Sequence, residues 1–164
     1  MTESNPLQSA QDLCMHGIAL SADGKREESL VVYAQVLQNY GRRRTAPFLK
    51  VLATAMFNTG TTLGHLGRNE EAVRAYDDLV KKLHKETDPK LLLYIVKAMM
   101  NKAYRLNILL KNDEAIATYE AVVARFDSSE DPETVPYIES VKSFLAERKA
   151  VLNASEQATG AQGG

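Results

Sequence analysis

Apolar and small residues recur along this chain with the spacing of helix faces. Met56, Gly60 and Leu63 lie four and three residues apart, which places them on one face of a helix. A second stripe with helical spacing follows a few residues later and consists of Ala72, Val73, Tyr76, Leu79 and Val80. The pattern therefore predicts two amphipathic helices in close succession.

The residues between the two stripes, LGRN at 66–69, have the composition of a turn. Gly67 can adopt the left-handed backbone conformation that ends many helices. Asn69 stands where an N-cap is expected, and Glu70 and Glu71 would then lie near the positive end of the helix dipole. The segment is therefore predicted to be a helical hairpin, in which small residues at 60 and 72 allow close approach beside Tyr76.

The same hairpin pattern occurs three times at an interval of 43 residues. The turn glycine recurs as Gly24, Gly67 and Leu110. Other positions keep the same interval, with similar residue types in each set: Tyr33, Tyr76 and Tyr119; Glu28, Glu71 and Glu114; Gly17, Gly60 and Ala103. A single hairpin cannot bury its apolar stripe alone, so the repeats are expected to stack on one another.

Asp-Pro pairs at 88–89 and 131–132 mark further helix starts, because proline suits the first turn of a helix. We expect repeat units at about 8–41, 45–84 and 88–127, and a capping helix at 131–152 with Pro136 in its first turn. Together these form one helical repeat domain at 8–152. Residues 1–7 are expected to be a flexible N-terminus, and 153–164, which are small and polar, a disordered tail.

The pattern G-x2-L in the first helix and A-x3-Y in the second resembles the tetratricopeptide repeat (TPR). Gly60 with Leu63 and Ala72 with Tyr76 match it best, and the resemblance covers roughly 8–152. It implies an all-α, right-handed α-solenoid of about three helix-turn-helix repeats plus a C-terminal capping helix. The interval of 43 is longer than the usual 34, and no proline closes a unit. A HEAT-like or armadillo-like helical solenoid is therefore the alternative fold.

Composition and charge narrow the possible functions. The 164 residues carry 20 basic and 21 acidic side chains, so no basic surplus is available to neutralise nucleic-acid phosphates. The single Cys14 fits a reducing compartment, and the first residues do not read as a signal peptide. Apolar runs such as 91–96 are far shorter than the ~20 residues of a membrane span. A cytoplasmic protein without membrane or nucleic-acid partners is expected.

No catalytic or metal-binding motif stands out, and we expect no enzyme activity, no metal and no cofactor. The histidines lack metal-ligand spacing, and His16 is expected on the packing side of its helix. The acidic pairs at 27–28, 70–71 and 113–114 fit the starts of helices. Two basic clusters, Arg42, Arg43 and Arg44 and Lys81, Lys82 and Lys85, suit the negative ends of helices; binding of phosphate or of an acidic partner is the alternative.

The resemblance implies that first helices line a concave groove that holds a peptide of another protein. Transferred by repeat position, the groove residues are Met15, Ile18, Thr54, Phe57, Asn58, Thr61, Lys97, Met100, Asn101, Tyr104 and Ile108. Amides among them can pair with a peptide backbone, while Phe57 and Tyr104 supply contact area. The chain is thus expected to be a non-catalytic protein-interaction scaffold.

The alternative function is structural. The first unit starts with a mostly apolar helix and without an obvious polar cap. The protein would then self-associate as a homo-oligomer or form an adaptor subunit of a larger complex.

Overall fold

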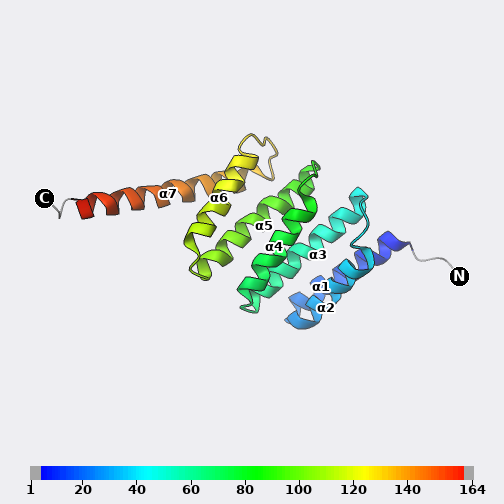
Figure 1. The fold of residues 1–164 in the computed structure, drawn as a ribbon. Helices are drawn as coiled ribbons and strands as arrows, with labels where there is room; N and C mark the ends of the chain where they lie inside the picture. Colours follow the sequence, from blue (N-terminus) through cyan, green and yellow to red (C-terminus); the bar gives the residue numbers. More distant parts are fainter. Residues whose placement is uncertain (1–4, 161–164) are drawn as a thin grey trace.

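The computed structural model describes the backbone of residues 5–160 and the side chains of residues 5–150. Every regular element in this part of the chain is an α helix, which confirms the expected all-α fold. The helices are α1 (Pro6–Ala22), α2 (Arg26–Tyr40), α3 (Ala46–His65), α4 (Asn69–Leu83), α5 (Pro89–Ile108), α6 (Asn112–Phe126) and α7 (Val135–Gly160). Helices α1 to α6 form three hairpins in a row, and α7 extends away from the last of them (Figure 1).

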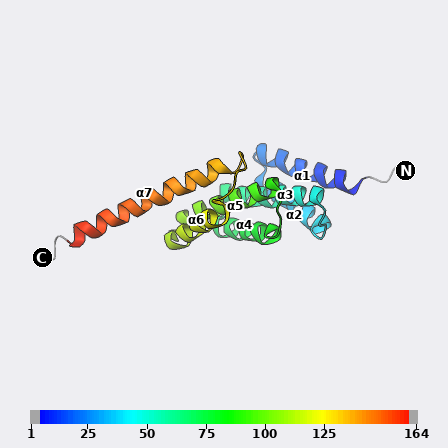
Figure 2. The ribbon, with the colours of Figure 1, turned by 90° about the horizontal axis from the view of Figure 1, so that it is seen from above.

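The hairpins stack so that first helices form one layer and second helices the other (Figure 2). Helix α3 packs on both α1 and α5. Helices α2 and α4 each pack on the first helices of their own and the next hairpin, and α6 packs on α5 and α7. Within the described helices, no Cα atom of α2 or α6 approaches α4 within 8 Å. Because second helices stand farther apart than first helices, the stack curves with the first helices on its inner side.

The two long edges of the stack differ in what they contain (Figure 1). One edge, the turn edge, holds the turns within hairpins, at residues 23–25, 66–68 and 109–111. The other, the connection edge, holds the links between successive hairpins and α7, at residues 41–45, 84–88 and 127–134. Second helices begin at the turn edge and end at the connection edge.

The three turns share a left-handed residue, as the repeat predicted at the first two. Gly24 and Gly67 have φ values of 80° and 75°, which glycine adopts without steric cost. Leu110 occupies the same position with φ of 59°, although a side chain is disfavoured there. The left-handed turn geometry is therefore the same where leucine stands in place of glycine.

The predicted N-cap of α4 is wrong by one residue. Arg68 is the N-cap, and Asn69 is the first helical residue. The reason is that the Ala72 amide donates to the Arg68 carbonyl at 3.0 Å, which starts the helical hydrogen-bond ladder at that residue. Glu70 and Glu71 lie in the first turn, as predicted.

Close helix contact within hairpins depends on glycine facing tyrosine. A Cβ atom added at Gly60 would lie 2.5 Å from Tyr76 Cε1, and one at Gly17 would lie 2.6 Å from Tyr33 Cε1. Both tyrosines are buried, with exposures of 0% and 1%. The predicted fit of Tyr76 beside small residues is therefore confirmed.

The buried residues form a core that runs through the stack. One cluster joins α1, α2 and α3 through residues such as Val36 and Leu52. A larger cluster begins in α3 and includes Leu83, Ile95 and, from α7, Ile138. Each hairpin thus buries its apolar stripe against its neighbours, as stacked repeats require.

The start of the stack differs from two expectations. Helix α1 begins at Pro6, inside the segment 1–7 that was expected to be flexible, because the Asn5 side chain caps it through the Leu7 amide at 3.0 Å; residues 1–4 lie outside the described part. The side chains of Gln8, Asp12 and His16 are exposed, so the edge helix carries a polar face. His16 is therefore not on the packing side.

Helix α7 differs from its expected bounds of 131–152. It begins at Val135, so Pro136 lies in the first turn as predicted. A start at 132 would have placed the Pro136 ring inside the helix, where it collides with a carbonyl and lacks an amide hydrogen. The helix continues to Gly160, because no glycine or proline follows Pro136 before that point and alanine, glutamate, lysine and arginine favour helix. Residues 161–164 of the expected disordered tail lie outside the described part.

Candidate functional site

The predicted groove residues all lie on α1, α3 and α5, in the inner layer of the stack. We call this surface the first-helix face; it comprises Met15, Ile18, Thr54, Phe57, Asn58, Thr61, Lys97, Met100, Asn101, Tyr104 and Ile108. None of them is buried, and three large apolar side chains among them are conspicuously exposed: Met15 at 61%, Tyr104 at 55% and Ile108 at 45%. Other exposed large apolar side chains lie elsewhere, namely Val31 on α2, Leu110 in a turn and Phe144 on α7, so the first-helix face carries three of six among the described residues.

One hollow of this layer lies between α1 and α3 and has a volume of about 410 Å³. Its lining consists of Gln11, Cys14, Met15, Pro47, Lys50, Val51 and Thr54. Burial raises the pKa of the Cys14 thiol to about 11, so the group stays protonated at neutral pH. The wall is therefore largely apolar, with Lys50 as its charged member.

A second hollow, of about 340 Å³, lies along α3 and α5 near the segment that precedes α7. Its lining consists of Phe57, Lys90, Leu93, Tyr94, Lys97 and Glu133. The Phe57 and Tyr94 rings meet edge to face with centroids 5.9 Å apart, and the Tyr94 hydroxyl lies 2.8 Å from the Thr54 hydroxyl. These contacts hold an aromatic wall in place.

Some predicted residues use their polar groups inside the fold. The Tyr76 hydroxyl reaches the inner layer, where it lies 3.2 Å from the Thr61 hydroxyl and accepts from the Asn101 amide at 3.3 Å. Thr61 and Asn101 therefore join α3, α4 and α5, and only part of their hydrogen-bonding capacity is left for a ligand.

Sequence reasoning missed Lys50, Lys90 and Tyr94. They lie closer to the N-termini of α3 and α5 than the family positions do, so transfer by repeat position could not reach them. The signal that could have found them is the length of these first helices, 20 residues each.

Lysines dominate the charges near the two hollows. Lys50 pairs with Asp88 at 3.0 Å, and this contact, with amide hydrogens from the α5 N-terminus, holds the pKa of Asp88 below its usual range. The Lys97 ammonium group lies 5.3 Å from the centroid of the Tyr137 ring. Lys90 and Lys97 share their hollow with a single carboxylate, Glu133.

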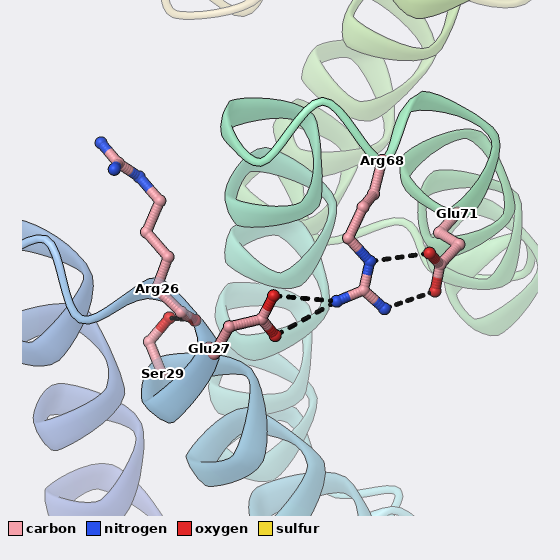
Figure 3. A network of polar contacts seen from close by, with 5 residues as sticks. All are labelled: Arg26, Glu27, Ser29, Arg68 and Glu71. Atoms are coloured by element: carbon pink, nitrogen blue, oxygen red, sulfur yellow. Dashed lines mark hydrogen bonds and ion pairs between the residues drawn. The ribbon is translucent and has the colours of Figure 1, made fainter.

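The acidic pairs at the turn edge act as structural partners. Arg68 binds Glu71 through two contacts of 2.7 Å and reaches Glu27 of the preceding hairpin at 3.2 Å (Figure 3). Arg68 lowers the pKa of Glu71, because it stabilises the ionised carboxylate. This geometry ties two hairpins together, which the sequence did not predict, and both acids lie in the first turns of their helices, as expected.

A family model described as Tetratricopeptide repeat matches residues 54–83. Residues 54–83 are therefore similar to a tetratricopeptide repeat, and the all-helical stack is consistent with that family. The matched segment holds Gly60, Leu63, Ala72 and Tyr76, the unit that resembled the family best. The comparison with curated proteins found no match.

The tetratricopeptide match suggests a role as a protein-interaction scaffold, since such repeats are generally non-catalytic modules. Helices of the described part are too short or too polar to cross a membrane. Across the same residues, no three histidine, cysteine or acidic side chains gather in a way that could hold a metal ion.

Proposed function

We propose that this TPR-like protein binds a peptide segment of a partner protein on its first-helix face. The observation that carries the proposal is the presence of two hollows in one layer, separated by the Thr54–Tyr94 hydroxyl pair. Apolar side chains of a peptide would enter the hollows, and exposed Met15 and Tyr104 would supply further contact. Asn58 and Lys97 would pair with its polar groups.

The charges favour a peptide that carries acidic residues beside its apolar anchors. Lys90 and Lys97 line one hollow together with a single carboxylate, Glu133, whereas Lys50 of the other hollow is already paired with Asp88. Complementary charge would guide the encounter and set the register of the peptide, and the apolar anchors would supply most of the affinity.

A displayed random-peptide library, selected on the purified full chain, tests the proposal. Selected peptides would be measured by calorimetry against wild type and a Met15→Ala/Tyr104→Ala variant. We expect affinity to fall at least about tenfold, because two exposed apolar anchors are lost.

A matched control is Val31→Ala/Gln38→Ala, which removes exposed side chains of α2 in the opposite layer. It should leave the affinity unchanged. Equal losses in the two variants, or none in either, would show that the first-helix face is not the binding surface.

We also propose that residues 8–152 form one domain whose stack α7 closes. The repeat positions of buried Val96 and Met99 are occupied in α7 by Glu139 and Lys142, which pair at 2.9 Å. This charged side of α7 does not suit a further packed helix.

A further inference from the structure

The fold brings Arg44 of the first basic cluster next to the second basic cluster, about 40 residues further along the sequence. A hollow of about 610 Å³ lies at the connection edge, where α2 and α4 end. Four cationic side chains line it: Arg44, Lys81, Lys82 and Lys85. We call this the basic hollow. It shares no lining residue with either hollow of the first-helix face.

The positive charges of the basic hollow are poorly balanced. Asp78 and Glu86 also line it, which leaves four cations against two carboxylates. Among the ion pairs within 4.0 Å in the described residues, none involves a cation of this hollow. Burial and the nearby charge of Arg44 lower the pKa of Lys82, because both disfavour its charged form.

Capping of helix ends accounts for only part of this charge. Lys82 donates to the Gly41 carbonyl at the end of α2, and Arg125 donates to the His84 carbonyl at the end of α4 at 3.2 Å. These two contacts already place a cation at the negative end of each helix. Arg44, Lys81 and Lys85 are additional to that structural requirement.

We propose that the basic hollow binds an acidic peptide segment of a partner protein. Its cations are spread over the last turn of α4, the residues after α4 and the residues after α2, a distribution that suits several carboxylates spaced along a chain. Met56 adds an apolar wall for a neighbouring side chain. Asp78 and Glu86 disfavour a compact, highly charged anion. This site is independent of what the first-helix face binds.

The test uses the full-length ¹⁵N-labelled chain titrated with a hexaglutamate peptide and followed by amide chemical shifts. Shifts should concentrate at residues 41–44 and 81–86. In a Lys81→Gln/Lys85→Gln variant, affinity should fall about tenfold, because each exposed charge contributes modestly. Both lysines are exposed, so the fold should persist, which circular dichroism checks.

The matched control is Lys25→Gln/Lys149→Gln, which removes the same charge from exposed lysines outside the hollow. It should change the affinity less than about twofold. Equal weakening in both variants, or shifts spread evenly over the molecule, would overturn the proposal. Inorganic phosphate is titrated in parallel; if it shifts the same amides and displaces the peptide at lower concentration, the hollow is a phosphate site instead.

The outcome is separable from that of the first-helix face. The Met15→Ala/Tyr104→Ala variant should bind hexaglutamate like wild type, whereas the lysine variant should keep its affinity for library-selected peptides. Loss of hexaglutamate binding in the Met15→Ala/Tyr104→Ala variant would contradict the assignment of the peptide to the basic hollow.

Discussion

Tyr76 in the second hairpin and Tyr119 in the third occupy the same repeat position, yet their surroundings differ. Tyr76 faces Gly60 and is fully buried, with its hydroxyl held by Thr61 and Asn101. Tyr119 faces Ala103, stays half-buried, and lies 4.8 Å from Phe144 of α7 between ring centroids. The two positions thus differ by the methyl group of Ala103. Tyr76 joins α3, α4 and α5, whereas Tyr119 packs against α7.

The largest effect is expected from exchanging the two small residues. Gly60→Ala would place a methyl group 2.5 Å from the Tyr76 ring and should reduce the free energy of unfolding by about 3 kcal/mol. The reciprocal Ala103→Gly should cost about 2 kcal/mol, through lost helix propensity and the loss of a fully buried methyl group. Urea denaturation followed by circular dichroism measures both. Equal costs for the two would remove the distinction between the hairpins.

The next largest effect on the free energy of unfolding is expected at the contact between the third hairpin and α7. Phe144→Ala removes the ring beside Tyr119 and should lower the free energy of unfolding by about 1.5 kcal/mol, since Phe144 is 36% exposed. Val31→Ala, at a side chain 59% exposed, should cost far less in the same denaturation experiment. A neutral Phe144→Ala would mean that Tyr119 does not depend on α7.

Removing the hydroxyl group of each tyrosine should have different effects on the free energy of unfolding. Tyr76→Phe should cost about 1 kcal/mol, because it breaks contacts with Thr61 and Asn101. Tyr119→Phe should be close to neutral, because its ring is only half-buried and water can serve its hydroxyl. A double-mutant cycle of Tyr76→Phe with Asn101→Ala should show coupling, and strict additivity would argue against the shared hydrogen bond.

The smallest effect concerns Asp88, which joins the second and third hairpins. Lys50 lowers its pKa in the folded state below the ordinary value of 3.8, so the pair stabilises the fold above that pH and this contribution is lost on acidification. Asp88→Asn keeps a capping side chain but removes the charge, and should cost about 0.5 kcal/mol at neutral pH.

The pH dependence is the sharper readout for Asp88. Between pH 5 and pH 3, thermal unfolding of wild type should lose more stability than that of Asp88→Asn. Parallel curves for the two proteins would indicate that the carboxylate has the same pKa folded and unfolded.

Sequence predicted the architecture where one residue type decides the local geometry. Gly24 and Gly67 predicted the left-handed turns, and Gly60 predicted the position against which the Tyr76 ring packs. The N-cap of α4 was predicted one residue too late, at Asn69, because a backbone hydrogen bond rather than a residue type sets it: the Ala72 amide donates to the Arg68 carbonyl. The length of α7 was also misjudged, because small polar composition does not prevent a helix.

The candidate sites were predictable only in part. Repeat positions led to Met15, Phe57 and Tyr104, which lie on one layer, but not to Lys50 or Tyr94, which precede the family pattern. The two basic clusters were visible in sequence as separate helix ends. Arg44 meets the lysines of α4 in one hollow because of the way the second hairpin stacks on the first. The sequence pattern does not give the distance between the ends of α2 and α4.

The spacing of the two layers has a mechanical consequence. First helices touch directly, whereas second helices are joined by long side chains such as Arg68 to Glu27 and Lys82 to the Gly41 carbonyl. The distances between first helices should therefore vary little, whereas the distances between second helices should vary more. Bending would open or narrow the first-helix face while the hairpins themselves move as rigid bodies.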